Sequence, residues 1–231
     1  MDQIIRKKSK KKLENSSSTA WIFDLDNTLY PEHCNLFAHI DVKMKAYITN
    51  LLGVDGDQAY KIQKDYFIRY GTTLRGLIEV HGVNPEDFMH FVHDIDLSPL
   101  KEDQELDRAL SEIRGRKFIF TNGEARYATR VLEKIGIEDQ FDGIFDIAAA
   151  GHIPKPNEVS YQNFIDHFGI DPKNAVMIED MARNLAPAAA LGMTTVWVKT
   201  RYEWGAMGYD AAHIDYEIDH LAGWLSETLQ T

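Results

Sequence analysis

Short runs of apolar, strand-forming residues recur along the chain and end in polar or charged residues. Runs of this kind are typical of central strands in a parallel sheet, which are buried on both faces. Segments with helical spacing separate the later runs, and each closes at a glycine suited to a helix C-cap. This alternation predicts an α/β fold with a Rossmann-like parallel sheet that helices cover on both faces. The runs are AWIFD at 20–24, KFIFTN at 117–122, NAVMIED at 174–180 and TTVWVK at 194–199.

About ninety residues lie between the first and second runs, far more than a single crossover connection needs. Most of this segment has apolar residues at helical spacing, as at 36–53 and 56–71. The stretch NPEDFMHFVHDI begins with Asn84 as the expected N-cap and Pro85 at the first helical position. We therefore expect a helical cap inserted after the first strand. The expected parts are a cap over 35–100 and a catalytic core formed by 19–34 and 101–231.

The composition is that of a globular protein from a reducing compartment. Of the 231 residues, 44% are hydrophobic, which is enough for a sizeable core. The single cysteine, Cys34, excludes an intramolecular disulfide and every cysteine-cluster metal site. No apolar run reaches about 18 residues and no signal-peptide pattern is present, so the sequence predicts no membrane span and a cytoplasmic location.

Charge is divided unevenly along the chain. The formal net charge is −11, yet the first twelve residues hold six basic residues against one acid. We interpret residues 1–18 as a disordered basic tail, with a contact to nucleic acid or anionic lipid as the alternative. The acidic remainder argues against a nucleic-acid partner and suits a site that binds a cation. The sequence does not indicate an oligomeric state.

Asp24 ends the first run and Asp26 follows two residues later, where burying a charge costs most. On a strand, residues i and i+2 project to the same side, so both carboxylates would face together at the carboxyl end of the sheet. Ligands bind at this edge in open α/β sheets. Carboxylates about 4–6 Å apart repel by a few kcal/mol unless a cation or a shared proton relieves them, and a magnesium ion would do so.

Polar residues with complementary chemistry follow the other predicted strands. Thr121 and Asn122 offer a hydroxyl and amides before a helix start, which is typical of an anion site. Glu179 and Asp180 end the third run, and Lys155 stands between two prolines on a stiff loop. Taken singly, each is typical of a turn, a cap or a solvated loop. Together they predict acids, a hydroxyl and a lysine that converge on one edge of the sheet.

The segments DLDNT, TNG, KP and EDMARN resemble, in this order, the four motifs of the haloacid dehalogenase superfamily of phosphatases. With its helical insertion, the resemblance covers essentially the chain after Thr19. DLDNTLYP and YGTTLRGL are similar to the pyrimidine 5′-nucleotidase-like branch. The resemblance implies a Mg²⁺-dependent phosphomonoester hydrolase acting on nucleoside 5′-monophosphates. The alternatives are a phosphatase of sugar phosphates or phosphoglycolate, a phosphomutase, and a non-catalytic binding protein that uses the basic tail.

The resemblance also implies a role for each motif residue. Asp24 would attack phosphorus to form an aspartyl-phosphate, and Asp26 would act as the acid and base. Thr121 and Asn122 would bind phosphoryl oxygens, and Lys155 would offset the charge of the phosphate and Asp24. Asp26 argues against dehalogenation, because dehalogenases lack a second carboxylate there. Mg²⁺ would be held by Asp24, the backbone carbonyl of Asp26, Asp180 and, through a bound water, Glu179.

The cap would exclude water during transfer and select the leaving group. Within it, the residues around Gly71 and Thr72 predict a break between two helices, and Arg69 or Arg75 would contact the substrate. The alternative is that Thr72 or Thr73 caps a helix while both arginines are solvated.

One further residue and one further segment leave alternatives open. Asn184 either orients Lys155 or Asp180, or lies on a helix surface. The aromatic-rich RYEWGAMGYD, at 201–210, either lines the site or packs.

Overall fold

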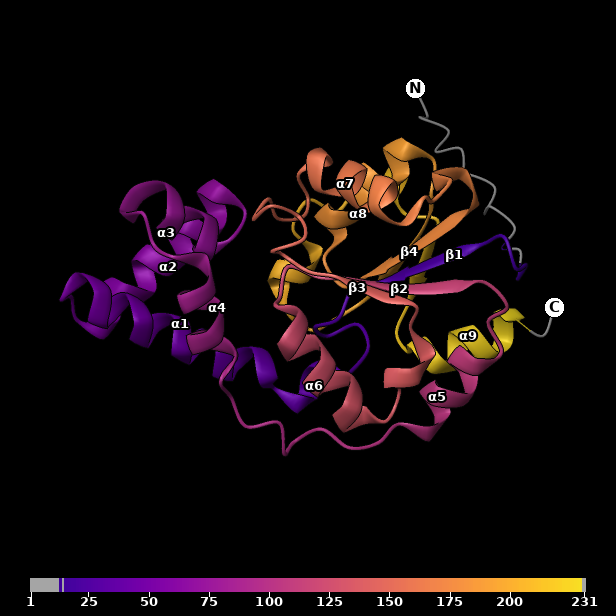
Figure 1. The fold of residues 1–231 in the computed structure, drawn as a ribbon, viewed down its shortest axis with the longest axis horizontal. Coiled ribbons are helices and arrows are strands. Elements are labelled where there is room, and N and C mark those ends of the chain that lie inside the picture. Colours follow the sequence, from indigo (N-terminus) through magenta and orange to yellow (C-terminus); the bar gives the residue numbers. More distant parts are fainter. Residues whose placement is uncertain (1–12, 14, 230–231) are drawn as a thin grey trace, which may run out of the picture.

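The computed structural model describes residue 13 and residues 15–229. Its centre is a sheet of parallel strands in the order β3-β2-β1-β4-β5-β6 (Figure 1). This is the Rossmann order, so the predicted α/β fold is confirmed. The strands are β1 (Ala20–Phe23), β2 (Arg116–Phe120), β3 (Gly143–Phe145), β4 (Ala175–Glu179), β5 (Thr194–Val198) and β6 (Tyr216–Ile218).

Helices cover both faces of this sheet, because the central strands bury apolar residues on both faces. Successive strand residues point to opposite faces, so Trp21 and Phe23 join one apolar cluster while Ala20 and Ile22 join the other. In Figure 1, α5, α6 and α9 lie below the sheet and α7 and α8 above it. These helices are α5 (Gln104–Ser111), α6 (Ala125–Ile135), α7 (Glu158–Phe168), α8 (Ala182–Leu191) and α9 (Leu221–Leu229).

The predicted helical cap is present between β1 and β2 and forms the lobe at the left of Figure 1. Asn84 caps the last of its helices by accepting from Glu86 N–H, and Pro85 is the first helical residue, as predicted. Thr72 caps the third by accepting from Arg75 N–H, which was the alternative for this threonine. The cap helices are α1 (Leu36–Leu52), α2 (Gly56–Tyr70), α3 (Thr73–His81) and α4 (Pro85–His93).

Several short elements were not predicted. Strands β3 and β6 have three residues each, too few to show alternation, and lie at the two edges of the sheet. Helices α5 and α9 are also short, with eight and nine residues. The remaining helical segments are η1 (Glu32–Cys34), η2 (Glu138–Gln140), η3 (Pro172–Asn174), η4 (Glu203–Ala206) and η5 (Ala211–His213).

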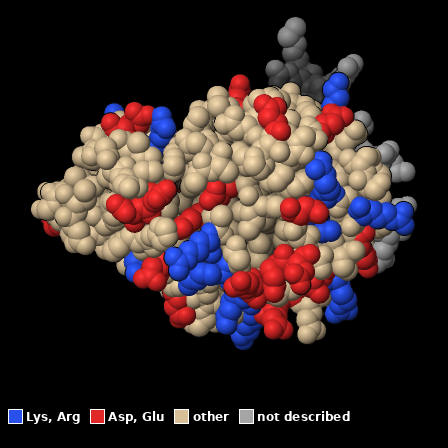
Figure 2. Space-filling model, in the orientation of Figure 1, with Lys and Arg blue, Asp and Glu red and all other residues tan. Residues whose placement is uncertain are grey.

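Most of the predicted basic tail, residues 1–18, lies outside the described residues. Its last part is tied to the core, because the Asn15 amide donates to the Glu112 carbonyl and accepts from the Arg114 N–H. On the face shown in Figure 2, the described Lys and Arg side chains are scattered among Asp and Glu. None of the helices in the described part of the chain has the length and apolar character that crossing a bilayer requires. The predicted cytoplasmic location stays a prediction.

Strand register sets the place of the site. Phe23 at the end of β1 pairs with Ile119 of β2 and Ile178 of β4. Asp24 therefore lies level with the last residues of both neighbours, and its N–H still donates to the Ile178 carbonyl at 2.9 Å. The order of strands reverses between β1 and β4, which is the position where Rossmann-like sheets bind ligands.

Close packing of α3 on α2 gives a first testable prediction. A Cβ atom added at Gly76 would lie 2.5 Å from the Tyr66 Cβ, whereas one added at Gly56 would meet no atom within 4 Å. We expect Gly76→Ala to lower the free energy of unfolding by about 1–3 kcal/mol through overpacking. The matched variant Gly56→Ala should leave it unchanged or raise it slightly, since Ala favours a helix over Gly. Urea unfolding of both variants measures the difference, and equal stabilities would contradict the packing argument.

Candidate active site

The Lys155 ammonium lies at the centre of the site and is 1% exposed. It donates to Asp24 Oδ1 at 2.7 Å, Glu179 Oε2 at 2.6 Å and the Phe120 carbonyl at 2.7 Å. These acceptors stand at the ends of β1, β4 and β2, so one side chain joins three neighbouring strands. Burial alone would lower the pKa of Lys155, but the two carboxylates outweigh it and hold the pKa above its ordinary value. The lysine therefore stays charged.

Asp24, Glu179 and Asp180 form an acidic cluster beside this lysine. One carboxylate oxygen of each lies within 4.8 Å of the others, and all three residues are buried. Oxygen donors at this spacing suit a hard divalent cation such as Mg²⁺. Both oxygens of Glu179 already accept hydrogen bonds, from Lys155 and from the Met181 N–H. Glu179 is thus held in place by two donors, and its predicted water-mediated role stays a prediction.

The acids of this cluster destabilise one another. Burial and the nearby Glu179 carboxylate raise the pKa of Asp24 to about 7, although Lys155 acts in the opposite direction. Burial, the Glu179 carboxylate and the Asp24 carboxylate raise the pKa of Asp180 well above its ordinary value. Negative charge therefore exceeds what Lys155 neutralises, and a bound cation would relieve this repulsion.

Asp26 is not part of this cluster; β1 ends at Phe23 and the chain then enters a turn. Its Oδ1 accepts hydrogen bonds from the hydroxyls of Tyr30 and Tyr127, the latter at 2.9 Å. Burial and the Asp26 carboxylate raise the pKa of both tyrosines well above the ordinary value, so their hydroxyls stay protonated. Asp24 and Asp26 still line one cavity, although the strand does not continue through them.

Thr121 and Asn122 lie on the loop that follows β2. The Thr121 side chain is buried, lines the cavity and accepts from the Gly123 N–H at 2.8 Å. The Asn122 amide holds the main chain of Lys155, accepting from its N–H at 2.8 Å and donating to its carbonyl at 3.2 Å. The Asn122 side chain therefore positions the lysine loop.

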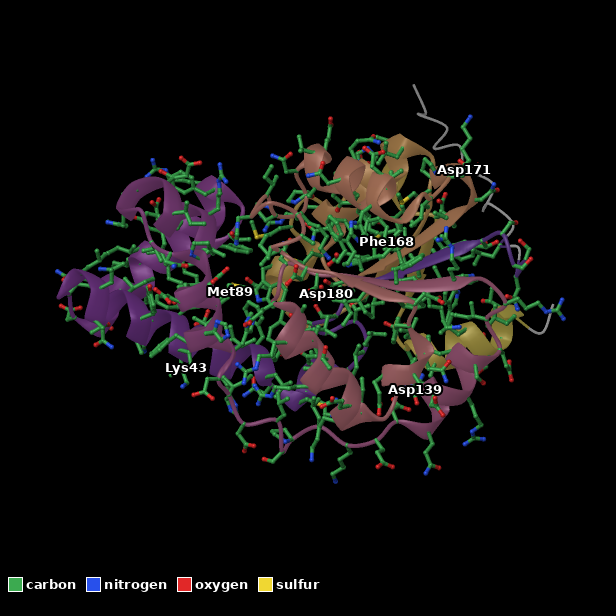
Figure 3. The ribbon with its side chains drawn as sticks, viewed as in Figure 1. Lys43, Met89, Asp139, Phe168, Asp171 and Asp180 are labelled. Atoms are coloured by element: carbon green, nitrogen blue, oxygen red, sulfur yellow. The ribbon has the colours of Figure 1, made fainter. Side chains whose placement is uncertain are left out.

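A cavity of about 500 Å³ extends from these residues into the cap. Figure 3 places Asp180 at the end of the sheet that faces the cap, with Met89 on α4 across from it, and both line the cavity. Arg183 of α8 also lines it and bridges the two lobes. Its guanidinium donates to the Gly71 carbonyl at 3.1 Å and lies 4.5 Å from the Phe67 ring centre. The apolar part of the lining includes Phe37, Ile40, Met44, Phe67, Phe88 and Met89.

The structure does not bring Arg75 to this cavity. Its guanidinium pairs with Glu79 one turn along α3, and Arg69 pairs with Asp65 in the same way on α2. Neither arginine belongs to the lining, whereas Arg183 does. The local sequence could not distinguish these cases, because it does not show which face of each helix is turned toward the cavity.

The structure bears on two alternatives left open by the sequence. Asn184 is buried and lines the cavity, so it is not a helix-surface residue, and its Oδ1 has no partner among the described residues. In segment 201–210, Trp204 and Met207 line the cavity, while Tyr209 packs against Trp197. Segment 201–210 therefore both lines the cavity and packs against the core.

Sequence reasoning missed several polar residues that support the site. Thr28 donates to Asp24 Oδ2 at 3.2 Å, and Asn27 adopts a left-handed backbone conformation with its amide 3.5 Å from Asp180. Both belong to DLDNT, so their proximity to Asp24 was a usable signal. Tyr127 and His93 come from α6 and α4, and no local pattern connects them with Asp26.

Comparison with known proteins agrees with this geometry. Residues 19–192 match the family described as haloacid dehalogenase-like hydrolase. A similar protein is phosphate metabolism protein 8 of Saccharomyces cerevisiae, 28% identical over 191 residues, which are 75% of this chain and 59% of that protein. The chain thus spans less than two thirds of this relative.

Solved structures share the fold. A haloacid dehalogenase-type phosphatase from Thermococcus onnurineus superposes with a TM-score of 0.62 at 21% identity, covering 91% of this chain and 97% of that one. An L-2-haloacid dehalogenase from Xanthobacter autotrophicus gives a TM-score of 0.55 at 14% identity, covering 90% and 97%. The fold alone therefore does not separate the two chemistries. The chain belongs to the haloacid dehalogenase-like hydrolases.

The crowded carboxylates predict how Asp180→Asn changes stability. The raised pKa means that folded Asp180 keeps its proton to a higher pH than the unfolded chain does, so stability falls as pH rises above about 4. Asparagine cannot ionise and escapes this loss. In chelator at about pH 8 we expect the variant to melt a few degrees above the wild type, with a smaller difference at about pH 5.

The same melting experiment tests the metal. Mg²⁺ should raise the melting temperature of the wild type and change that of Asp180→Asn little. Asp139→Asn, which alters an exposed acid, serves as the matched control and should behave as the wild type does. A variant that keeps the full response to Mg²⁺ would show that Asp180 is not a ligand.

Proposed function

We propose that this chain is a Mg²⁺-dependent phosphomonoester hydrolase that works through an aspartyl-phosphate, with nucleoside 5′-monophosphates as its substrates. The observation that carries the proposal is the convergence of Asp24, Lys155 and Asp180 at one end of a cavity whose other end lies in the cap. The second carboxylate, Asp26, favours phosphoryl transfer over dehalogenation within this family.

In the proposed reaction, an Asp24 oxygen attacks phosphorus while Asp26 protonates the leaving oxygen. Asp26 then takes a proton from the water that hydrolyses the aspartyl-phosphate. Lys155 holds Asp24 in place and offsets charge, and Thr121 offers its hydroxyl to a phosphoryl oxygen. Such positioned charges matter because uncatalysed monoester hydrolysis is so slow that enzymatic accelerations reach ~10²¹.

The donor set fits magnesium, since each candidate ligand offers oxygen. Asp24, Asp180 and the backbone carbonyl of Asp26 are the proposed ligands, with Glu179 acting through water. When bound, Mg²⁺ supplies positive charge that stabilises the phosphoryl group in the transition state.

The cap half of the cavity supports a nucleoside as the leaving group. Phe37 and Phe67 of the cap and Trp204 of the core offer aromatic surface for a flat base. A volume of about 500 Å³ is more than a two-carbon acid such as phosphoglycolate needs. Polar groups also line the cap: Gln63 donates to Asp41 Oδ1 at 2.7 Å, and its buried Oε1 has no partner among the described residues. A base with an N–H group would satisfy such an acceptor.

Replacing the proposed nucleophile tests the activity directly. Asp24→Asn should reduce phosphate release from a panel of nucleoside monophosphates by several orders of magnitude, because the amide is a poor nucleophile. Release by the wild type should require Mg²⁺. Unchanged release by the variant would falsify the proposal, and phosphoryl retention without release would favour a phosphomutase. RNA binding that is lost on deletion of the tail would favour the non-catalytic alternative.

Gln63→Met tests the substrate class. Its kcat/KM for cytidine 5′-monophosphate should fall about tenfold relative to the wild type, in line with a lost hydrogen bond, while that for ribose 5-phosphate should change little. Gln58→Met is the matched control, because Gln58 is exposed on the same helix and does not line the cavity. Equal losses on both esters would mean that Gln63 supports the cap and does not contact a base.

A further inference from the structure

Two tyrosine hydroxyls converge on one oxygen of Asp26. Tyr30 and Tyr127 both donate to Oδ1, and the two hydroxyl oxygens lie 3.3 Å from each other. No donor among the described residues contacts Oδ2. Asp26 itself is half-buried and lines the cavity. The carboxylate is thus held from one side, and a single oxygen remains available for proton transfer.

The two tyrosines come from separate parts of the core. Tyr30 stands four residues after Asp26 in the loop that leaves β1, whereas Tyr127 projects from α6. Their exposed fractions are 2% and 1%, so each hydroxyl needs a partner inside the protein. Leucine or phenylalanine would fill such positions without a polar group to satisfy. Packing alone therefore does not explain the two hydroxyls, which indicates that they have a further role.

A cap residue completes this arrangement. The His93 ring, at the end of α4, stacks on the Tyr127 ring with centroids 4.4 Å apart and planes 10° apart. Its Nδ1 lies 3.8 Å from the Glu124 carboxylate, too far for a hydrogen bond. Arg130 fixes the same stretch of the cap by donating to the His93 carbonyl at 3.1 Å. The position of Tyr127 is thus restrained from both lobes.

We propose that Tyr30 and Tyr127 are positioning residues that hold Asp26 so that Oδ2 exchanges the proton with the leaving group and with water. The inference rests on the proposed function. In the first step Oδ2 gives its proton to the bridging oxygen as the bond from that oxygen to phosphorus breaks and the Asp24 oxygen bonds to phosphorus. In the second, water gives a proton to Oδ2 as its oxygen replaces Asp24 on phosphorus.

The leaving group distinguishes this role from a structural one. An alkoxide must be protonated as it departs, whereas p-nitrophenolate leaves with little help. We expect Tyr30→Phe and Tyr127→Phe each to lower kcat/KM by about tenfold or more for the alkyl monoester that the wild type cleaves fastest, and by less than about threefold for p-nitrophenyl phosphate. The value kcat/KM reports the first transfer step, so slow hydrolysis of the aspartyl-phosphate does not obscure the comparison.

Two controls complete the experiment. Tyr66→Phe removes a hydroxyl that bonds to His81 in the cap, away from Asp26, and should leave both rates unchanged. In an Asp26→Asn background, Tyr127→Phe should have no further effect, because the tyrosine acts through the carboxylate. Equal losses on both esters, or a full additional loss in the Asp26→Asn background, would overturn the inference. Failure of the proposed function would appear in the wild type, which would then release phosphate from neither ester.

Discussion

The buried ammonium of Lys155 is the interaction on which the rest of the site depends. Removing an ammonium from water costs several kcal/mol unless charged and polar partners surround it. Lys155 has three such acceptors, and they stand at the ends of three adjacent strands. The lysine therefore holds Asp24 and Glu179 together, and with Asp180 they leave an excess of negative charge that only a cation or bound protons can balance. The contacts that fix the geometry of the site therefore also create the negative charge that would attract a cation.

The division of the chain into a core and a cap separates two tasks. The core supplies the charged groups, because parallel strands present their carboxyl ends at one edge and the register brings Asp24 level with the end of β4. The cap supplies most of the apolar wall and the polar group around Gln63, which together enclose the end of the cavity away from the acids. Arg183 connects the two, since it follows the acidic pair in the core yet contacts Gly71 and Phe67 of the cap.

The features that could be predicted are each encoded by residue types within a short stretch of chain. The strands of the sheet centre are four or five residues long and mostly apolar, and Asn84 with Pro85 marks a helix start through local backbone chemistry. The three-residue edge strands lack that signal, because pairing to a neighbour defines them and their own composition does not. Arg75 illustrates the same limit: its partner Glu79 lies one turn away, but only the packing of the cap decides that neither faces the cavity.

The sequence by itself determined the class of fold, the family and the acids, hydroxyl and lysine of the motifs, since these depend on residue type and order along the chain. Only the tertiary structure decided how they are supported. The hydrogen bonds that hold Asp26 come from Tyr30, in the loop after β1, and from Tyr127 of α6, 101 residues along the chain from Asp26. Arg183 reaches the cavity because α8 begins at the end of the sheet that faces the cap (Figure 3). Contacts of this kind arise from the direction in which packed helices present their side chains, which no local pattern records.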